Sequence, residues 1–426
     1  MPNKVVYLYQ IYGDNTIILD TAYVTENKKA AFILNDSLPT GLYRCLFGDN
    51  LYLDVIFNHG HIDFITEYNH PVDSMQVLVS KENKLLYDFF KFNRLYELKS
   101  EYLIPIIRFY PEKDDLYFLA EKKYNELQYQ RDSIIVQANK KYPDSFLAKY
   151  LNTFRTPIID TKMPDDEKIK YLKEHFFDYI DFNDTALFYS NGLTNKIIDF
   201  LKFYRNENIS RHDEELQFIE AVDLLFSKIS IDDACYNFIL EYLIKGFEHF
   251  KYDEVLEHIA ANYTVKSVCS NEERKSELQK ALDYYKKTAI GSTVPDIKLK
   301  DINGKEISMF DAVKTDFTML IFWQTTCPHC IELFPKLKDY YNSLEKRNFE
   351  IFAVSIDTNT EAWKKFIKEG GYNWINVNES NGWENKVLDD YNIFATPTIL
   401  ILDKKHKIIA KPVDMKEIRM ELKKIQ

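Results

Sequence analysis

The sequence of 426 residues has few cysteines, no long apolar run and no excess of positive charge. Its five cysteines include one closely spaced pair, which excludes the disulfide-dense scaffold of small secreted domains. The most apolar run, Phe317–Trp323, has the length of a buried strand and is too short to cross a bilayer. The net charge of −11 argues against a nucleic-acid-binding protein, which needs a basic surface.

The first residues, MPNKVVYLYQ, do not form a secretory signal peptide, because they lack a basic segment followed by an apolar stretch. Two interpretations remain at this point. The protein is cytosolic, or the sequence is that of a mature chain whose leader has been removed.

The length predicts two to four domains, since a domain usually has about 100–200 residues. Residues 1–95 contain short β-branched and aromatic runs separated by turn residues. These runs lie at 5–12, 16–24, 29–35, 41–47, 51–57 and 61–68. Such spacing predicts an antiparallel β-sandwich or small barrel.

From about Lys84 to Thr288 the apolar residues recur at helical spacing, which predicts an α-helical middle domain, residues 96–288. This block contains no recognisable catalytic constellation. After a linker at Ile290–Pro295, strands and helices alternate, which predicts a C-terminal α/β domain, residues 289–426. The predicted fold class is therefore multidomain α+β.

The cysteine pair, Cys327 and Cys330, follows the apolar run directly and opens an amphipathic helix. Thr326 is placed to cap this helix, and Pro328 suits its first turn because no amide donor is needed there. A helix N-terminus stabilises a thiolate through its free N–H groups and its dipole, and a protonated His329 would add to this effect. Cys330 lies one turn further in, so we expect Cys327 to attack and Cys330 to resolve the mixed disulfide.

Other uses of the pair are less well supported. Zinc needs two further ligands at suitable spacing, and the sequence His59-Gly60-His61 is more simply a turn. An inert disulfide across so small a loop removes little chain entropy. A peroxidatic cysteine would have a threonine three residues before it, where this sequence has Gln324.

The remaining cysteines, Cys45, Cys235 and Cys269, have no partner at motif spacing. We expect them to be buried as small hydrophobic residues.

Residues 290–426 resemble the thioredoxin superfamily and, more narrowly, the TlpA/ResA-like thiol–disulfide oxidoreductases of the bacterial cell envelope. Trp323 lies four residues before Cys327, as in the Trp-x-x-x-Cys motif of thioredoxins. Pro335 lies five after Cys330, like the helix-kink proline, and Thr396-Pro397 resembles the cis-proline turn that faces the cysteines. The segment GSTVPDIKLKDINGKEISM is similar to the family's first hairpin, and FAVSID is similar to its third core strand.

The resemblance implies a set of site residues, protein clients with thiols or disulfides, and a partner redox protein as the source of reducing equivalents. It implies no metal and no bound organic cofactor. The catalytic residues would be Cys327, Cys330, His329 and Pro397, and the client-binding residues would be Trp323, Thr396 and Pro328.

Two departures from the family's pattern concern the proton acceptor of the resolving thiol. Ile321 stands where thioredoxins carry a buried acid, and Glu332 lies two residues after Cys330 instead of three. Glu332 is the nearest candidate, although a solvent-facing position is the simpler interpretation. The dipeptide Pro328-His329 is that of DsbA-type oxidants in a domain that resembles reductants, so the direction of transfer stays open.

The N-terminal segments resemble a β-domain and a helical segment found ahead of such thioredoxin-like domains in envelope proteins. Family members are usually exported, often as lipoproteins, which predicts a periplasmic or cell-envelope location and a removed leader. The rival hypothesis is a binding or scaffolding protein in which the thioredoxin-like fold is only structural.

Overall fold

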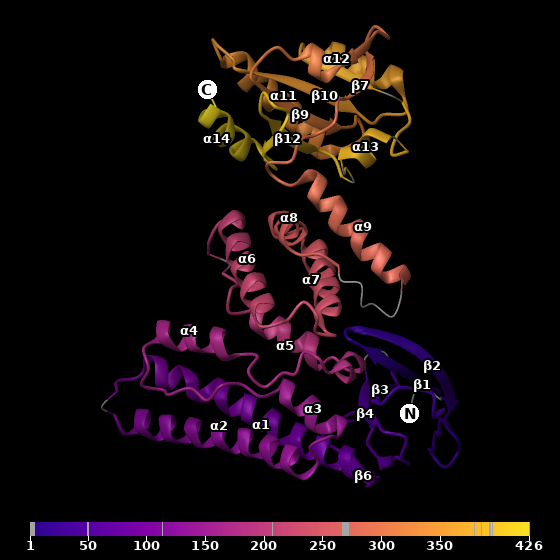
Figure 1. Ribbon diagram of the computed structural model, residues 1–426, viewed down its shortest axis with the longest axis vertical. Coiled ribbons are helices and arrows are strands. Elements are labelled where there is room, and N and C mark those ends of the chain that lie inside the picture. Colours follow the sequence, from indigo (N-terminus) through magenta and orange to yellow (C-terminus); the bar gives the residue numbers. More distant parts are fainter. Residues whose placement is uncertain are drawn as a thin grey trace. The chain divides into compact units, whose positions relative to one another are not determined.

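The structure is a computed structural model, and it describes residues 5–425 except 49–50, 113, 207, 266–271, 379, 385, 392 and 394. The chain forms two compact units, Met1–Gly246 and Phe247–Gln426 (Figure 1). The boundary at 246/247 lies inside the predicted middle domain, and the predicted division at 95/96 and 288/289 stays a prediction. Among the described residues, no helix has the length and apolar character needed to cross a membrane.

The first unit begins with a four-stranded antiparallel sheet in the order β2-β1-β3-β4, which confirms the predicted antiparallel strands. Strands β2 and β4 are its edges, so the described residues form an open sheet and not the predicted barrel, and helix α1 (Lys81–Phe109) packs on it where a sandwich would have a second large sheet. A separate hairpin, β5-β6, follows it. The strands are β1 (Val5–Tyr12), β2 (Asn15–Tyr23), β3 (Gly41–Leu46), β4 (Tyr52–Phe57), β5 (Asp63–Ile65) and β6 (Gln76–Val79).

The strand predicted at residues 29–35 is wrong. This segment has no regular structure, although Phe32 and Leu34 pack against the core and Ile33 between them is 97% exposed. The alternation of side chains is therefore that of an extended chain. A strand also needs backbone hydrogen bonds to a neighbouring strand, and the alternation of side chains does not show whether these form.

Helices make up the rest of the first unit. They are α1 (Lys81–Phe109), α2 (Asp115–Lys141), α3 (Phe146–Thr153), α4 (Asp165–His175), the 3₁₀ helix η1 (Thr185–Tyr189), α5 (Gly192–Leu201), α6 (Arg211–Ser227) and α7 (Tyr236–Phe250), which crosses the unit boundary. Buried Leu86 and Phe89 of α1 join Leu42 and Ile56 of the sheet in one apolar cluster. Asn83 fixes α1 to edge strand β4, since its side chain accepts from Ile56 N at 2.7 Å and donates to Ile56 O at 2.8 Å.

The second unit contains α8 (Asp253–Asn262), α9 (Glu272–Thr288) and a seven-stranded mixed sheet in the order β13-β12-β9-β10-β11-β7-β8. The strands are β7 (Lys298–Asp301), β8 (Glu306–Ser308), β9 (Phe317–Trp323), β10 (Phe349–Ser355), β11 (Ile375–Asn378), β12 (Thr398–Leu402) and β13 (Ile408–Ala410). The helices are α10 (Met309–Ala312), α11 (Pro328–Ser343), α12 (Thr360–Gly370), α13 (Lys386–Tyr391) and α14 (Met415–Ile425). Together they form the predicted thioredoxin-like α/β fold.

Both faces of this sheet are covered, which explains why β9 is apolar along its whole length. Met319, Ile321 and Trp323 lie in the cluster that includes α11, α12 and α14. Leu320 and Phe322 lie in the opposite cluster, which includes α10 and α13. Because the side chains of a strand point alternately to its two faces, β9 contributes to both apolar clusters.

The topology also gathers three loops at one edge of the sheet. Strands β9 and β10 are parallel, with Trp323 opposite Ser355, so their carboxyl ends lie together. Strand β12 runs antiparallel to β9 and begins at Thr398, which lies opposite Phe322. The segments that follow Trp323 and Ser355 and the segment that precedes Thr398 therefore meet at this edge.

Candidate active site

Helix α11 is capped by a cysteine. Cys327 is its N-cap residue, and the Sγ atom accepts a hydrogen bond from Cys330 N at 3.3 Å. Pro328 occupies the first turn, as predicted. The prediction that Thr326 caps the helix is wrong: Thr326 is exposed, and the helix begins one residue too late for its hydroxyl to serve.

The Cys327 sulfur also lies against the turn that precedes β12. Its thiol donates to Thr396 O at 3.1 Å, and the Thr396–Pro397 peptide bond is cis, as the family resemblance implies. Cys327 is 6% exposed and Cys330 is fully buried, and both are free thiols. The two cysteines and the Thr396-Pro397 turn are thus brought together as the resemblance implies.

The two thiols differ in acidity. Burial by itself raises the pKa of Cys327, but hydrogen bonds from the Cys330 and Thr396 side chains and from the backbone N–H groups of Cys330 and His329 lower it below its usual value. Burial raises the pKa of Cys330, and its hydrogen bond to Cys327 raises it further. Of the two sulfurs, Cys327, the more accessible one, therefore loses its proton more readily.

The side chains around the pair divide into a buried and an exposed group. Trp323 is fully buried, with its ring 4.3 Å from that of Phe334 and 5.2 Å from that of Phe366. Trp323 therefore supports the site from within the core. It has no exposed surface with which to make the predicted contact with a client. Pro328 and His329 are exposed at the helix start.

The two departures from the family's pattern take different places in the structure. Ile321 is fully buried in the apolar cluster beneath α11. Glu332 is exposed on α11, which is the simpler of the two interpretations given for it above.

One acidic residue beside the site was missed by the sequence reasoning. Asp357 follows β10, is 6% exposed and accepts hydrogen bonds from Thr325, two residues before Cys327. The two residues are 32 positions apart, so no spacing rule connects them. The only signal was that FAVSID, recognised as a core strand, ends in an acid.

The other cysteines behave as predicted where the structure describes them. Cys45 is 7% exposed and Cys235 is fully buried. Cys269 lies outside the described residues.

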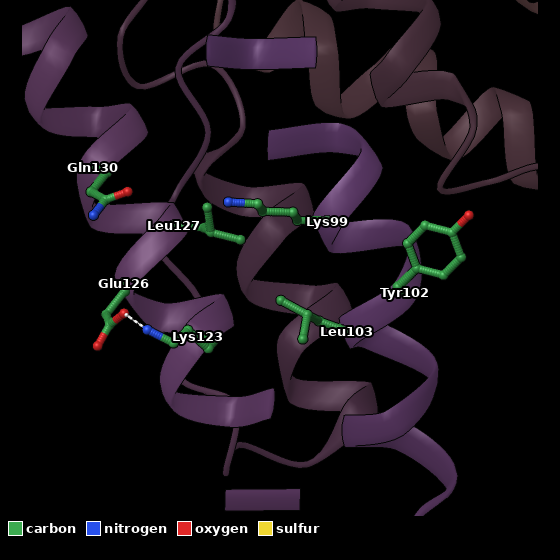
Figure 2. Close-up of a pocket in the computed structure, with 7 residues that line it drawn as sticks. All are labelled: Lys99, Tyr102, Leu103, Lys123, Glu126, Leu127 and Gln130. Atoms are coloured by element: carbon green, nitrogen blue, oxygen red, sulfur yellow. Dashed lines mark hydrogen bonds and ion pairs between the residues drawn. The ribbon is translucent and has the colours of Figure 1, made fainter. Parts of the chain in front are cut away.

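A cavity of about 400 Å³ lies between α1 and α2, in the first unit (Figure 2). Its lining includes Tyr102, Leu103 and Leu127, and the ion pair Lys123–Glu126 spans 2.9 Å at its rim. The residues that line it include no thiol.

The convergence of these loops on one thiol pair is that of a thioredoxin-like redox domain. The AhpC/TSA family matches residues 290–411. The thiol-disulfide oxidoreductase ResA of Bacillus subtilis is 31% identical over 119 residues, which are 28% of this chain and 64% of that protein. ResA of Geobacillus kaustophilus is 30% identical over 120 residues, which are 28% of this chain and 67% of that protein.

Among solved structures, the thioredoxin domain of a thiol-disulfide oxidoreductase from Bacteroides vulgatus is 31% identical. The match covers 32% of this chain and 97% of that domain, with a TM-score of 0.30. The chain spans a little under two thirds of the length of the Bacillus subtilis relative. On the sequence matches, the chain belongs to the ResA-like thiol–disulfide oxidoreductases of the thioredoxin superfamily.

Proposed function

We propose that this protein exchanges thiols and disulfides with protein clients in the bacterial cell envelope, and that it acts as a reductant. The direction of transfer rests on the likeness to ResA, because a stabilised thiolate by itself favours the reduced pair and hence an oxidant. The observation that carries the exchange chemistry is the position of Cys327 at the N-cap of α11, where its Sγ atom accepts from Cys330 N and lies against Thr396 O. In this position the pKa of Cys327 is lowered and that of Cys330 is raised. An inert structural pair needs no such difference.

The reaction has two balanced steps. The Cys327 thiolate attacks a sulfur of the client disulfide, so the client S–S bond breaks, a mixed disulfide forms and one client thiolate leaves and takes up a proton. Cys330 then loses its proton and attacks Cys327 Sγ, which releases the second client thiol and leaves a Cys327–Cys330 disulfide. The client gains two electrons. A partner redox protein of the dithiol class then supplies two further electrons to the Cys327–Cys330 disulfide and is itself oxidised to a disulfide.

The exposed surface beside Cys327 suits an extended client. Ala395 is exposed and Thr396 and Pro397 are partly exposed in the turn before β12. A client strand would bind here through backbone hydrogen bonds, which would place its disulfide beside Cys327 and Pro328. His329 tunes the thiolate mainly through its backbone N–H.

The reduction potential of the Cys327–Cys330 pair, measured by equilibration against glutathione, tests the direction of transfer. A value near that of thioredoxin, about −270 mV, supports the reductant. A value near that of DsbA, about −120 mV, would make the protein a disulfide donor and overturn this part of the proposal.

Catalysis itself is tested with Cys327→Ser in an insulin-reduction assay with dithiothreitol. We expect the rate to fall to that of the reagents alone. A scaffolding protein predicts instead that client binding and the cellular phenotype survive the substitution unchanged.

A further inference from the structure

A buried carboxylate holds the turn that precedes the thiol pair. Asp357 Oδ1 accepts hydrogen bonds from Thr325 N at 3.0 Å and from Thr325 Oγ1 at 2.6 Å. Its Oδ2 accepts from Thr325 N at 3.1 Å and from Ser355 Oγ at 2.8 Å. Both polar groups that Thr325 can donate are therefore bound by one side chain, and the buried charge has the donors it needs.

Asp357 is itself held by residues at the ends of two strands. Asn378, at the end of β11, donates from Nδ2 to Asp357 O at 2.9 Å and to Ser355 Oγ at 3.0 Å. Asp357 N donates to Ser355 Oγ at 3.1 Å. Ser355 is fully buried and Asn378 is 4% exposed, so the group is fixed by the rigid sheet and not by a mobile loop.

The turn is also fixed at its two ends. Ile356 N donates to Trp323 O at 2.9 Å, and Cys327 N donates to Gln324 O at 3.2 Å. The Cys327 sulfur can accept from Cys330 N and face Thr396 O only if the turn between β9 and α11 keeps this shape. A small displacement of the turn would move the sulfur out of line with the N–H groups of the helix.

We propose that Asp357 is a positioning residue, which clamps Thr325 and thereby holds the Cys327 sulfur against the free N–H groups of α11. Asp357 does not act as a proton carrier, because its oxygens are occupied by Thr325 and Ser355. The inference rests on the proposed function in one respect, since it concerns the thiol that the proposal makes the nucleophile.

The test is the pH profile of iodoacetamide alkylation at Cys327 in the reduced full chain, followed by peptide mass spectrometry. For Asp357→Ala we expect the midpoint to move up toward the ordinary value of about 8.5, and the rate at pH 7 to fall roughly three- to tenfold. Thr325→Val, which removes only the hydroxyl bond, should move the profile in the same direction by less. The double variant should differ little from Asp357→Ala, because the two substitutions disrupt the same interaction between Asp357 and Thr325.

Asp296→Ala is the matched control. Asp296 also accepts two hydrogen bonds in this domain, from Ser308 Oγ at 2.8 Å and from Phe310 N at 3.0 Å, but it holds α10 and not the cysteine turn. It should lower the melting temperature and leave the alkylation profile unchanged.

The proposal is overturned if Asp357→Ala and Thr325→Val lower the melting temperature but keep the wild-type midpoint. If Asp357→Ala does not fold, Thr325→Val decides alone. The outcome is separate from the proposed function: a wild-type protein that fails to reduce insulin would refute that function, whatever the two variants do to the alkylation profile.

Discussion

Cys45 and Cys327 lie in different units and are exposed to a similar small extent, 7% and 6%. Cys45 lies near the end of β3, between Leu8 of β1 and Leu53 of β4, and burial raises its pKa to about 12. Cys327 lies just beneath the surface at a helix start, where hydrogen bonds outweigh burial and its pKa is lowered. The pKa values of two thiols with little access to water are thus shifted in opposite directions.

The difference shows that the donors around a sulfur decide its reactivity more than its exposed fraction does. Cys235 supports this view, because it is fully buried and burial raises its pKa to about 12, with nearby aspartates adding to the shift. Its thiol donates to Asp184 O at 3.8 Å, as that of Cys327 does to Thr396 O at 3.1 Å, so a carbonyl acceptor alone does not separate the two sulfurs. The helix N-terminus at Cys327 separates them, because its N–H groups point at the sulfur.

The largest difference in activity is expected between the alanine variants of Cys327 and Cys45. Cys327→Ala should reduce insulin-reduction activity to the background rate, because the attacking sulfur is lost. Cys45→Ala should keep full activity and cost about 1 kcal/mol of unfolding free energy, since it removes one small buried group. Turnover and urea denaturation of both variants test the contrast, and an active Cys327→Ala would break it.

A second effect concerns the reactivity of the thiols in the wild-type protein. At pH 7 we expect iodoacetamide to modify Cys327 at least about 100-fold faster than Cys45 or Cys235, since only the thiolate reacts. As pH falls through the pKa of Cys327 the thiolate gains a proton and its rate drops, while the buried thiols stay slow until the pH nears 12. Peptide mass spectrometry across pH measures each site, and equal rates in the folded protein would contradict the account.

The smallest effect is expected at His329. Its side chain is exposed and its backbone N–H acts on the sulfur, so His329→Gln should change the Cys327 alkylation rate at pH 7 by less than about threefold. A larger change would mean that the imidazolium charge, and not the backbone, tunes the thiolate. Repeating the measurement at high salt separates the two, because salt screens the exposed charge.

Much of the site could be predicted because its chemistry is local in the sequence. Trp323, Cys327 and Cys330 follow one apolar strand, and the start of α11 at Pro328 follows from the same pattern. Pro397 is far away in the sequence and was found only through the family's motif. The cap was misplaced by one residue, because propensity favours a threonine hydroxyl and does not anticipate a sulfur acceptor.

Other features depend on contacts that no sequence pattern contains. Asp357 binds Thr325 across 32 positions, and it is the pairing of β9 with β10 that brings them together. The side-chain alternation at residues 29–35 predicted a strand that has no ladder. In the same way, the short runs before residue 80 indicated antiparallel strands but not that α1 would cover their sheet.

Trapping of a mixed disulfide tests the central claim most directly, that Cys327 is the attacking thiol and Cys330 the resolving thiol. Cys330→Ala and Cys327→Ala are each reduced, freed of reductant and incubated with oxidised insulin, and the products are read by non-reducing electrophoresis and mass spectrometry. The account predicts a stable adduct at Cys327 in Cys330→Ala, released by dithiothreitol, and none in Cys327→Ala. An adduct at Cys330, or no adduct in Cys330→Ala, would contradict it.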